Sequence, residues 1–186
     1  MSLSQPASHE HLAIEAELRA GSCRFVRERL RLPMGIEGSF GWLRHPDTVL
    51  VVPRGGDGRF LLVRRYRPAV GRWVLEFPSG PLEPGETPAA GAARLLRELT
   101  GQAGQHWRRL GALRPNPGYS DEHMTLGLMT LAEPGAEAVA ELETPPDLEL
   151  WRCTAAALEA ALTGVEECVD GRSVSAWLLA GPLASR

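Results

Sequence analysis

The segment from Gly80 to Gly101 constrains the fold of this chain more than any other stretch. Its first half contains two glycines and two prolines, which interrupt regular secondary structure and therefore predict a structured loop. Thr87 followed by Pro88 is typical of a helix start, because threonine caps free backbone N–H groups and proline fits the first turn. Helix-forming residues continue to Thr100, and Gly101 predicts the C-cap. We therefore expect a loop followed by one helix.

Charged residues of this segment divide between the loop and the helix. The loop carries Glu83 and Glu86, and the helix carries Arg94 and Glu98. Carboxylates gathered at a loop–helix junction can bind a hard cation through their oxygen atoms. At about 100° per residue, the other helix positions form a wide apolar face, so the helix is expected to pack on a core. These apolar positions are Ala92, Ala93, Leu95, Leu96 and Leu99.

The segment, called the box below, resembles the Nudix box. That pattern is Gly, five residues, Glu, seven residues, Arg-Glu, an aliphatic residue, any residue, Glu-Glu, any residue, Gly and an aliphatic residue. The residues that match it are Gly80, Glu86, Arg94, Leu96, Glu98 and Gly101. Leu95 and Leu99 stand where two glutamates belong, and Gln102 stands where the closing aliphatic residue belongs. The spacing is therefore that of the family, while part of its acidic chemistry is missing.

The segments that flank the box resemble those of ADP-ribose pyrophosphatases within the Nudix family. Residues 64–68 and 75–80 precede the box in the way typical of that subgroup, and residues 115–122 resemble its following loop. The subgroup has a proline about sixteen residues beyond the last glycine of the box, and Pro117 fills that place. The resemblance implies hydrolysis of a nucleoside diphosphate linked to another group, as when ADP-ribose gives AMP and ribose 5-phosphate.

The same resemblance implies roles for individual residues. Metal ions, Mg²⁺ or Mn²⁺ if the domain is active, would be held by the Ser79 carbonyl and by the carboxylates of Glu98, Glu86 and Glu122. Glu98 would take part in catalysis, and the general base would come from the late acidic connection, as Glu143 or Glu141. The residues implied in substrate binding are Arg64, Arg67, Glu76, Pro117 and Tyr119. A purely structural role, holding Arg94 or the loop, is the alternative for Glu86.

The two leucines in the box decide how the activity is interpreted. Mg²⁺ requires oxygen ligands, which a leucine side chain cannot supply. One hypothesis is a Nudix hydrolase of ADP-ribose or nucleotide sugars, with activity reduced by Leu95 and Leu99. The alternative is a catalytically silent Nudix domain that binds a nucleotide or nucleotide sugar as a sensor or interaction module, a role that requires no bound metal. A dimeric scaffold with a vestigial pocket is a third option.

The order of elements along the chain predicts an α+β fold, an α/β/α sandwich with a mixed sheet between helices. Residues 1–44 are expected to form an N-terminal arm and β-hairpin that makes a homodimer contact, and residues 45–186 the Nudix domain. Within the arm, residues 4–20 could be a short helix or disordered. Strands are expected at residues 23–32, 39–43, 47–53, 60–66, 73–77, 107–113, 123–131 and 148–153. Helices are expected at residues 89–100, 154–162 and 173–180, with Thr154 and Ser173 as caps.

The amino-acid composition argues against some classes of binding partner and favours a reducing cellular compartment. The net charge is −3 and no broad basic patch is evident, which argues against nucleic-acid binding. Arginines do cluster at residues 24–31 and 64–72, as solvated strand faces or as contacts for an anionic ligand. Three widely spaced cysteines without a CxxC motif indicate free thiols in a reducing compartment. No apolar run has the length of a membrane span, so we expect a cytoplasmic protein that does not enter membranes.

Overall fold

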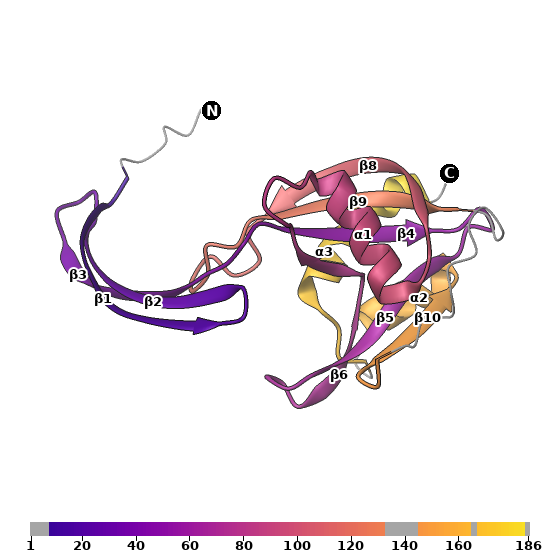
Figure 1. Cartoon of the computed structure of the whole chain (residues 1–186). Helices are drawn as coiled ribbons and strands as arrows, with labels where there is room; N and C mark the ends of the chain where they lie inside the picture. Colours follow the sequence, from indigo (N-terminus) through magenta and orange to yellow (C-terminus); the bar gives the residue numbers. More distant parts are fainter. Residues whose placement is uncertain (1–7, 133–144, 165–166, 185–186) are drawn as a thin grey trace. The chain divides into compact units, whose positions relative to one another are not determined.

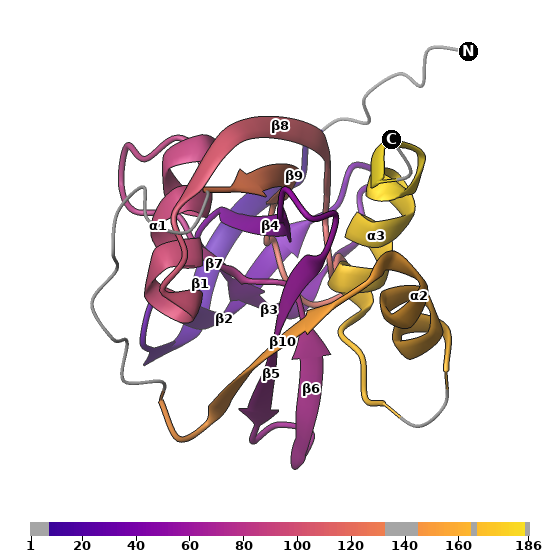
Figure 2. The same cartoon turned by 90° about the vertical axis from the view of Figure 1, so that its right-hand side faces the viewer.

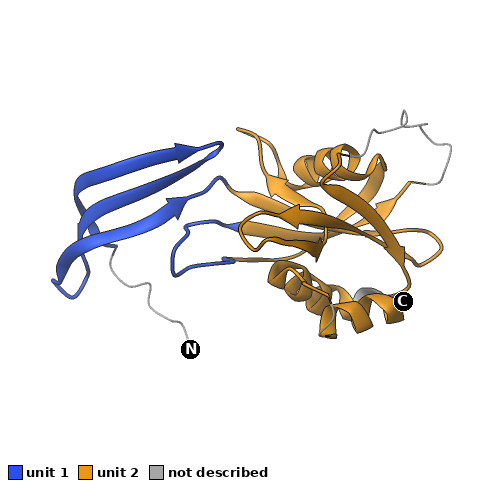
Figure 3. Cartoon of the chain, turned by 90° about the horizontal axis from the view of Figure 1, so that it is seen from below, with its two compact units in different colours: residues 1–46, 114–123 blue, residues 47–113, 124–186 orange. Residues whose placement is uncertain are grey.

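The computed structural model of the chain describes residues 8–132, 145–164 and 167–184. Its residues form two compact units, coloured separately in Figure 3. Unit 1 contains residues 1–46 and 114–123, and unit 2 contains residues 47–113 and 124–186. The predicted division after residue 44 lies close to the first of these boundaries. The loop 114–123, which the sequence assigns to the second domain, groups with the N-terminal unit instead.

Unit 1 is built on a three-stranded antiparallel sheet, in the order β1 (Glu10–Ala20), β2 (Cys23–Arg31) and β3 (Glu37–Arg44). The interpretation of residues 4–20 as a helix or disordered arm is wrong from Glu10 onward, because β1 pairs along the length of β2 (Figure 1). Its pairing contains two register shifts, so the strand lacks the clean alternation that would have marked it in the sequence. Tertiary pairing here overrides the helix-forming alanine, glutamate and leucine residues.

One face of the unit 1 sheet is buried and the other is exposed. Val26, Glu28 and Leu30 alternate along β2 as buried residues, whereas Arg27 and Arg29 between them and Phe25 before them are exposed. The loop 114–123 continues the pairing at the end of β3, where Leu43 N donates to Tyr119 O at 2.7 Å and Asp121 N donates to Leu43 O at 3.2 Å. Unit 1 therefore combines a sheet with one loop from the middle of the chain.

Unit 2 contains a seven-stranded mixed sheet. Its strand order is β10-β5-β4-β9-β8, with β6 added to β5 and β7 added to β4. The strands β4 and β9 run parallel, and the other pairs are antiparallel. The strand bounds are Thr48–Arg54 for β4, Phe60–Arg67 for β5, Arg72–Glu76 for β6, Ser79–Pro81 for β7, Gly104–Leu113 for β8, Met124–Leu131 for β9 and Leu148–Cys153 for β10. The predicted strands of this unit are confirmed to within a few residues.

Helices cover both faces of the unit 2 sheet (Figure 2). The helix α1 (Pro88–Thr100) packs on one face with apolar residues of β4, β5 and β9, among them Val49, Val51 and Leu61. The helices α2 (Ala155–Thr163) and α3 (Gly171–Ala184) pack on the other face. This arrangement confirms the predicted α/β/α layering. No helix among the described residues has the length and hydropathy needed to cross a lipid bilayer.

The helix ends agree with the sequence at two helices and differ at the third. Thr154 accepts from Ala157 N at 3.3 Å and caps α2 as predicted. The helix α3 begins at Gly171, before Ser173, so the predicted cap is wrong. The Ser173 hydroxyl instead accepts from Phe77 N at 2.8 Å and donates to Asp170 Oδ2 at 3.3 Å. This serine therefore links α3 to the chain segment that enters the box.

Replacing Gly127 with alanine is expected to destabilise unit 2. A Cβ at this position of β9 would lie 2.1 Å from the indole of Trp107, which packs against the core under α1. Overpacking of this kind costs about 1–3 kcal/mol. We expect a lower Tm in thermal unfolding followed by circular dichroism. Gly118→Ala is the matched control, because nothing lies within 4 Å of its added Cβ. Equal melting temperatures for the two variants would contradict this account of the core.

Candidate functional site

From Leu82 onward the box adopts the predicted loop and helix, and its caps are as expected. The assignment of Gly80 and Pro81 to the loop is wrong, because both lie on β7 and pair with Val49 and Thr48 of β4. Thr87 accepts from Ala90 N at 3.3 Å at the start of α1. Gly101 closes the helix with φ of 69°, a left-handed conformation that glycine adopts without steric cost. The local sequence therefore determines where this helix begins and ends.

Glu86 turns toward Arg94, which ties the loop of the box to its helix. Arg94 donates to both carboxylate oxygens of Glu86, at 2.9 and 2.7 Å, and to Pro81 O at 3.0 Å. The backbone N–H of Glu83 also donates to Glu86, at 3.0 Å. The hydrogen bonds from Arg94, followed by the one from Glu83, lower the pKa of Glu86 to about 2. Glu86 is thus a structural anion in this geometry, and it stays ionised at neutral pH.

Leu95, one of the two leucines of the box, packs in the core below α1. Its side chain is only 6% exposed and lies against Gly80, where an added Cβ would be 2.7 Å from Leu95 Cδ2. Leu99, one turn later, is half-buried. Glu98 is 55% exposed and pairs with Arg94 at 3.2 Å. The helix therefore presents hydrocarbon toward the start of the box.

The carboxylates of the box do not fit a metal cluster. Across the part of the chain that the structure describes, no group of three or more His, Cys, Asp or Glu side chains is arranged to hold a metal ion. Ser79, whose carbonyl is implied as a metal ligand, lies on β7 opposite Leu50. Glu122 is buried and belongs to unit 1. The two candidates for the general base, Glu141 and Glu143, lie outside the described residues.

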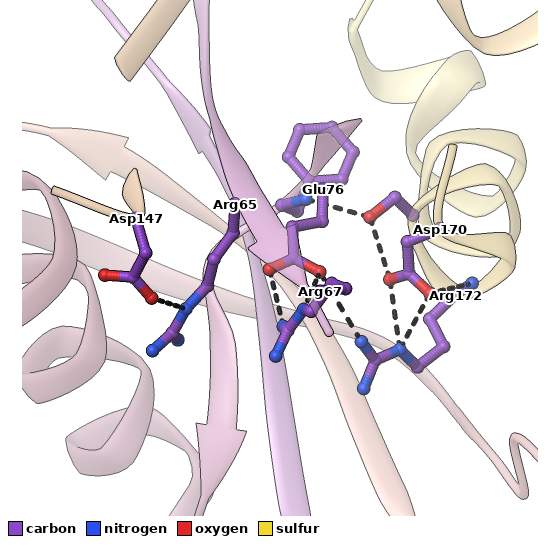
Figure 4. A network of polar contacts seen from close by, with 8 residues as sticks. Arg65, Arg67, Glu76, Asp147, Asp170 and Arg172 are labelled. Carbon is purple, nitrogen blue, oxygen red and sulfur yellow. Dashed lines mark hydrogen bonds and ion pairs between the residues drawn. The ribbon is translucent and has the colours of Figure 1, made fainter. Parts of the chain in front are cut away.

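A network of arginines and carboxylates surrounds Glu76 at the end of β6 (Figure 4). The Glu76 side chain is only 4% exposed, and it accepts from Arg67 Nε at 3.2 Å and Arg67 Nη2 at 2.5 Å. Arg172 Nη2 lies 3.8 Å away, and Asp170 holds this guanidinium through Nε at 2.9 and 3.0 Å. Burial raises the pKa of Glu76, and Arg67 opposes that effect. Glu76 is therefore a desolvated carboxylate stabilised by two cationic neighbours.

Strand alternation separates the two arginines predicted to bind substrate. Arg67, Arg65 and Glu76 share one face of the sheet, because Val63, two residues before Arg65, pairs with Glu76. Arg64 points to the opposite face, where it meets Glu149 at 3.4 Å and Glu167 at 3.5 Å. Arg65 lies 3.5 Å from Asp147. The period of two along β5 could have identified Arg65 as the neighbour of Arg67, whereas nothing in the sequence marks Arg172.

Pro117 and Tyr119, the other predicted substrate residues, lie on the loop of unit 1. They line an open groove of about 550 Å³ on the buried face of the unit 1 sheet. Phe40, Trp42 and Arg44 of β3 form another part of its wall. The groove thus combines aromatic surface with a cationic side chain.

Comparison with known proteins places these features in a family. A model of the NUDIX domain matches residues 44–167. An ADP-ribose pyrophosphatase of Bacillus subtilis (strain 168) is 33% identical over 95 residues, which are 51% of each chain. An ADP-ribose pyrophosphatase of Mycobacterium tuberculosis is 33% identical over 127 residues, which are 67% of this chain and 61% of that protein. The matches therefore span about half to three fifths of these relatives.

The fold also has a counterpart among solved structures. The crystal structure of an ADP compounds hydrolase superposes with a TM-score of 0.73 at 23% identity, covering 100% of this chain and 97% of that one. At this identity the comparison establishes the fold alone. The predicted architecture is thereby confirmed.

Replacing Glu86 with glutamine is expected to reduce stability at neutral pH but not in acid. The pKa of Glu86 falls from 4.5 to about 2 on folding, so its stabilising contribution is complete above pH 4.5 and is lost as the pH falls toward 2. The free energy of unfolding in urea should drop by about 1–2 kcal/mol at pH 7. Its difference from the parent protein should narrow below pH 4.5.

Glu83→Gln is the control for this measurement. The Glu83 carboxylate is exposed and lies 3.9 Å from Arg94 Nε, so its loss should change stability little. A Glu86→Gln difference that stays constant from pH 7 to pH 3 would refute the assigned role of the carboxylate.

Proposed function

The chain belongs to the NUDIX domain family, and from this premise we propose that it binds nucleoside diphosphate derivatives and hydrolyses them slowly. The substrate class is ADP-ribose or a nucleotide sugar. Two bacterial relatives named ADP-ribose pyrophosphatases support this class, each at 33% identity. Because the chain spans 51% and 61% of their lengths, the activity is a proposal for this protein.

The packing of Leu95 is the observation that carries the reduced rate. A pyrophosphate is anionic and resists attack by water unless its charge is neutralised, which divalent metals achieve. Leu95 and Leu99 occupy two positions where the family pattern has glutamates, and neither offers an oxygen ligand. Leu95 also fills the space beside Gly80. We therefore propose a low-affinity or rearranged site for Mg²⁺ or Mn²⁺, which uses Glu98 and the Ser79 carbonyl.

Arginines on the α1 face of the sheet support binding of an anionic ligand. Arg65 and Arg67 lie on one face of β5, and guanidinium groups bind phosphate oxygens in a bidentate manner. Arg67 is already paired with Glu76, so a phosphate must compete with this carboxylate. Competition of this kind lowers affinity but leaves the cationic character of the site intact.

A silent binding domain is the second candidate, and the Glu86–Arg94 ion pair favours it. This contact stabilises the box without help from a metal ion, so the fold does not depend on catalytic carboxylates. What remains is a folded Nudix domain with an arginine-rich face and no strong requirement for Mg²⁺. Such a domain would act as a sensor or an interaction module.

We also retain the proposals of a homodimer and a cytoplasmic location. Ile14, Leu18 and Phe25 are exposed apolar residues on the unit 1 sheet, which supports contact with a second copy. The three cysteines are free thiols, as expected of a reducing compartment.

An assay with defined substrates tests the proposal. Purified protein is incubated with ADP-ribose and a panel of nucleoside diphosphate sugars in Mg²⁺ and in Mn²⁺, and release of nucleoside monophosphate is followed. We expect turnover at least about 100-fold below the 10 s⁻¹ typical of enzymes. Turnover within tenfold of 10 s⁻¹ would refute the proposal that hydrolysis is slow. If no product forms, calorimetric binding of the same compounds supports the silent domain, and absence of binding refutes both candidates.

Arginine variants locate the binding face in the same titrations. Arg67→Ala removes a guanidinium on the α1 side of β5, and Arg64→Ala removes one on the opposite side. We expect Arg67→Ala alone to weaken binding. Loss of affinity in Arg64→Ala alone would place the ligand elsewhere.

Restoring carboxylates in the box should raise metal-dependent hydrolysis. The double variant Leu95→Glu/Leu99→Glu gives the helix the oxygen ligands of the family pattern, and we expect at least a tenfold rise in Mg²⁺-dependent product release. Leu95→Gln/Leu99→Gln is the matched control, since it has similar size and polarity without charge. Both variants need an unfolding measurement, because Leu95 is buried and a polar group there costs about 1–3 kcal/mol. Equal rates in two folded variants would contradict the assigned cause.

A further inference from the structure

Two histidines converge at the start of β1 in unit 1. His9 and His11 are two residues apart, so they project to the same side of an extended chain. Their Nε2 atoms lie 3.2 Å apart, and their ring centroids are 4.9 Å apart at an interplanar angle of 60°. Two nitrogens bound to one tetrahedral metal ion, at about 2.0–2.1 Å each, would lie about 3.3–3.4 Å apart. The pair is therefore spaced as two ligands of one metal ion.

A buried carboxylate contacts one of these two imidazole rings, through the ring nitrogen that does not face the other histidine. Glu28 on β2 is 0% exposed, and Arg44 pairs with its Oε1. Its Oε2 accepts no well-aligned hydrogen bond from the described residues and lies 2.6 Å from Nδ1 of His11. Burying a carboxylate is costly unless both oxygens are satisfied. A proton on Nδ1 of His11 would satisfy Oε2 and leave the lone pair on Nε2, beside His9.

This arrangement matches the outer shell of known metal sites. Histidine ligands commonly donate their second ring N–H to a carboxylate, which fixes the tautomer and makes the coordinating nitrogen more basic. We propose that His9 and His11 form a binding site for a transition-metal ion of the Zn²⁺ class, oriented by Glu28. The site lies in unit 1 and uses no residue of the box. Imidazole nitrogens favour Zn²⁺, Ni²⁺ and Cu²⁺ over the oxygen-seeking Mg²⁺.

The remaining coordination positions would be filled from the groove. The described residues provide no third His, Cys, Asp or Glu in a metal-binding arrangement, so water or a bound anion must complete the shell. His9 and His11 line the groove of about 550 Å³ together with Arg44, Arg114 and Asp121. The space admits solvent, and its two arginines suit an anionic ligand on the metal.

Calorimetric titration of the untagged full chain tests the site. Protein is stripped with EDTA, dialysed, and titrated at pH 7.5 with Zn²⁺, Ni²⁺, Cu²⁺ and Mg²⁺ separately. We expect one transition-metal ion per chain, with Cu²⁺ bound most tightly and Mg²⁺ not bound at this site. Affinity for Zn²⁺ should fall in acid, because protons compete with the metal ion for imidazole nitrogens.

Side-chain substitutions test which residues bind the metal ion. His9→Gln/His11→Gln should abolish binding, and both side chains are exposed, so the fold should survive. Glu28→Gln should weaken Zn²⁺ binding by about 10–100-fold while leaving a site. His106→Asn is the control, since His106 is exposed on β8 with a φ of 55° that asparagine tolerates.

Two results would overturn the proposal. One is the absence of saturable Zn²⁺, Ni²⁺ and Cu²⁺ binding, which would mean that the two rings only share a hydrogen bond. The other is unchanged binding in His9→Gln/His11→Gln, whatever the result for His106→Asn. Circular dichroism of each variant excludes unfolding as the cause, and the His pair alone decides the result if Glu28→Gln does not fold.

Discussion

The ion pair between Arg94 and Glu86 is the contact on which the box depends. One guanidinium joins the helix α1 to the loop before it through both carboxylate oxygens and the Pro81 carbonyl. The pair is only partly exposed, so its hydrogen bonds are shielded from solvent and hold a fixed geometry. With the loop in place, Gly80 meets Leu95 closely. The segment therefore keeps its shape through contacts that need no metal ion.

The residues that maintain the shape of the box differ from those that carry buried charge on this side of the sheet. Gly80, Glu86, Arg94 and Gly101 maintain the loop and helix of a Nudix domain, and the family comparison agrees with them. Leu95 contributes to the core below α1. The buried charge on this side of the sheet is concentrated around Glu76, where Arg67 and Arg172 offset the cost of desolvation.

Some features followed from local sequence, and others did not. The caps of α1 and the strands of unit 2 were predictable, because turn residues, glycine and apolar periodicity act within a few residues of each other. The strand β1 was missed, since its pairing with β2 contains register shifts and its composition suits a helix. Arg64 and Arg67 were grouped as substrate residues, although alternation along β5 places them on opposite faces. The pairing of Glu76 with Arg172 joins β6 to α3, and no local pattern encodes such a contact.

The sequence by itself determined the family and the layered α+β architecture. These depend on spacing and residue type, which are readable along one chain. Only the tertiary structure decided that Glu86 faces Arg94, that Leu95 is more buried than Leu99, and that the loop 114–123 joins the N-terminal sheet. It also brought Glu28 to His11 across two strands. Such outcomes depend on packing between distant segments, where burial and pairing energies outweigh local preference.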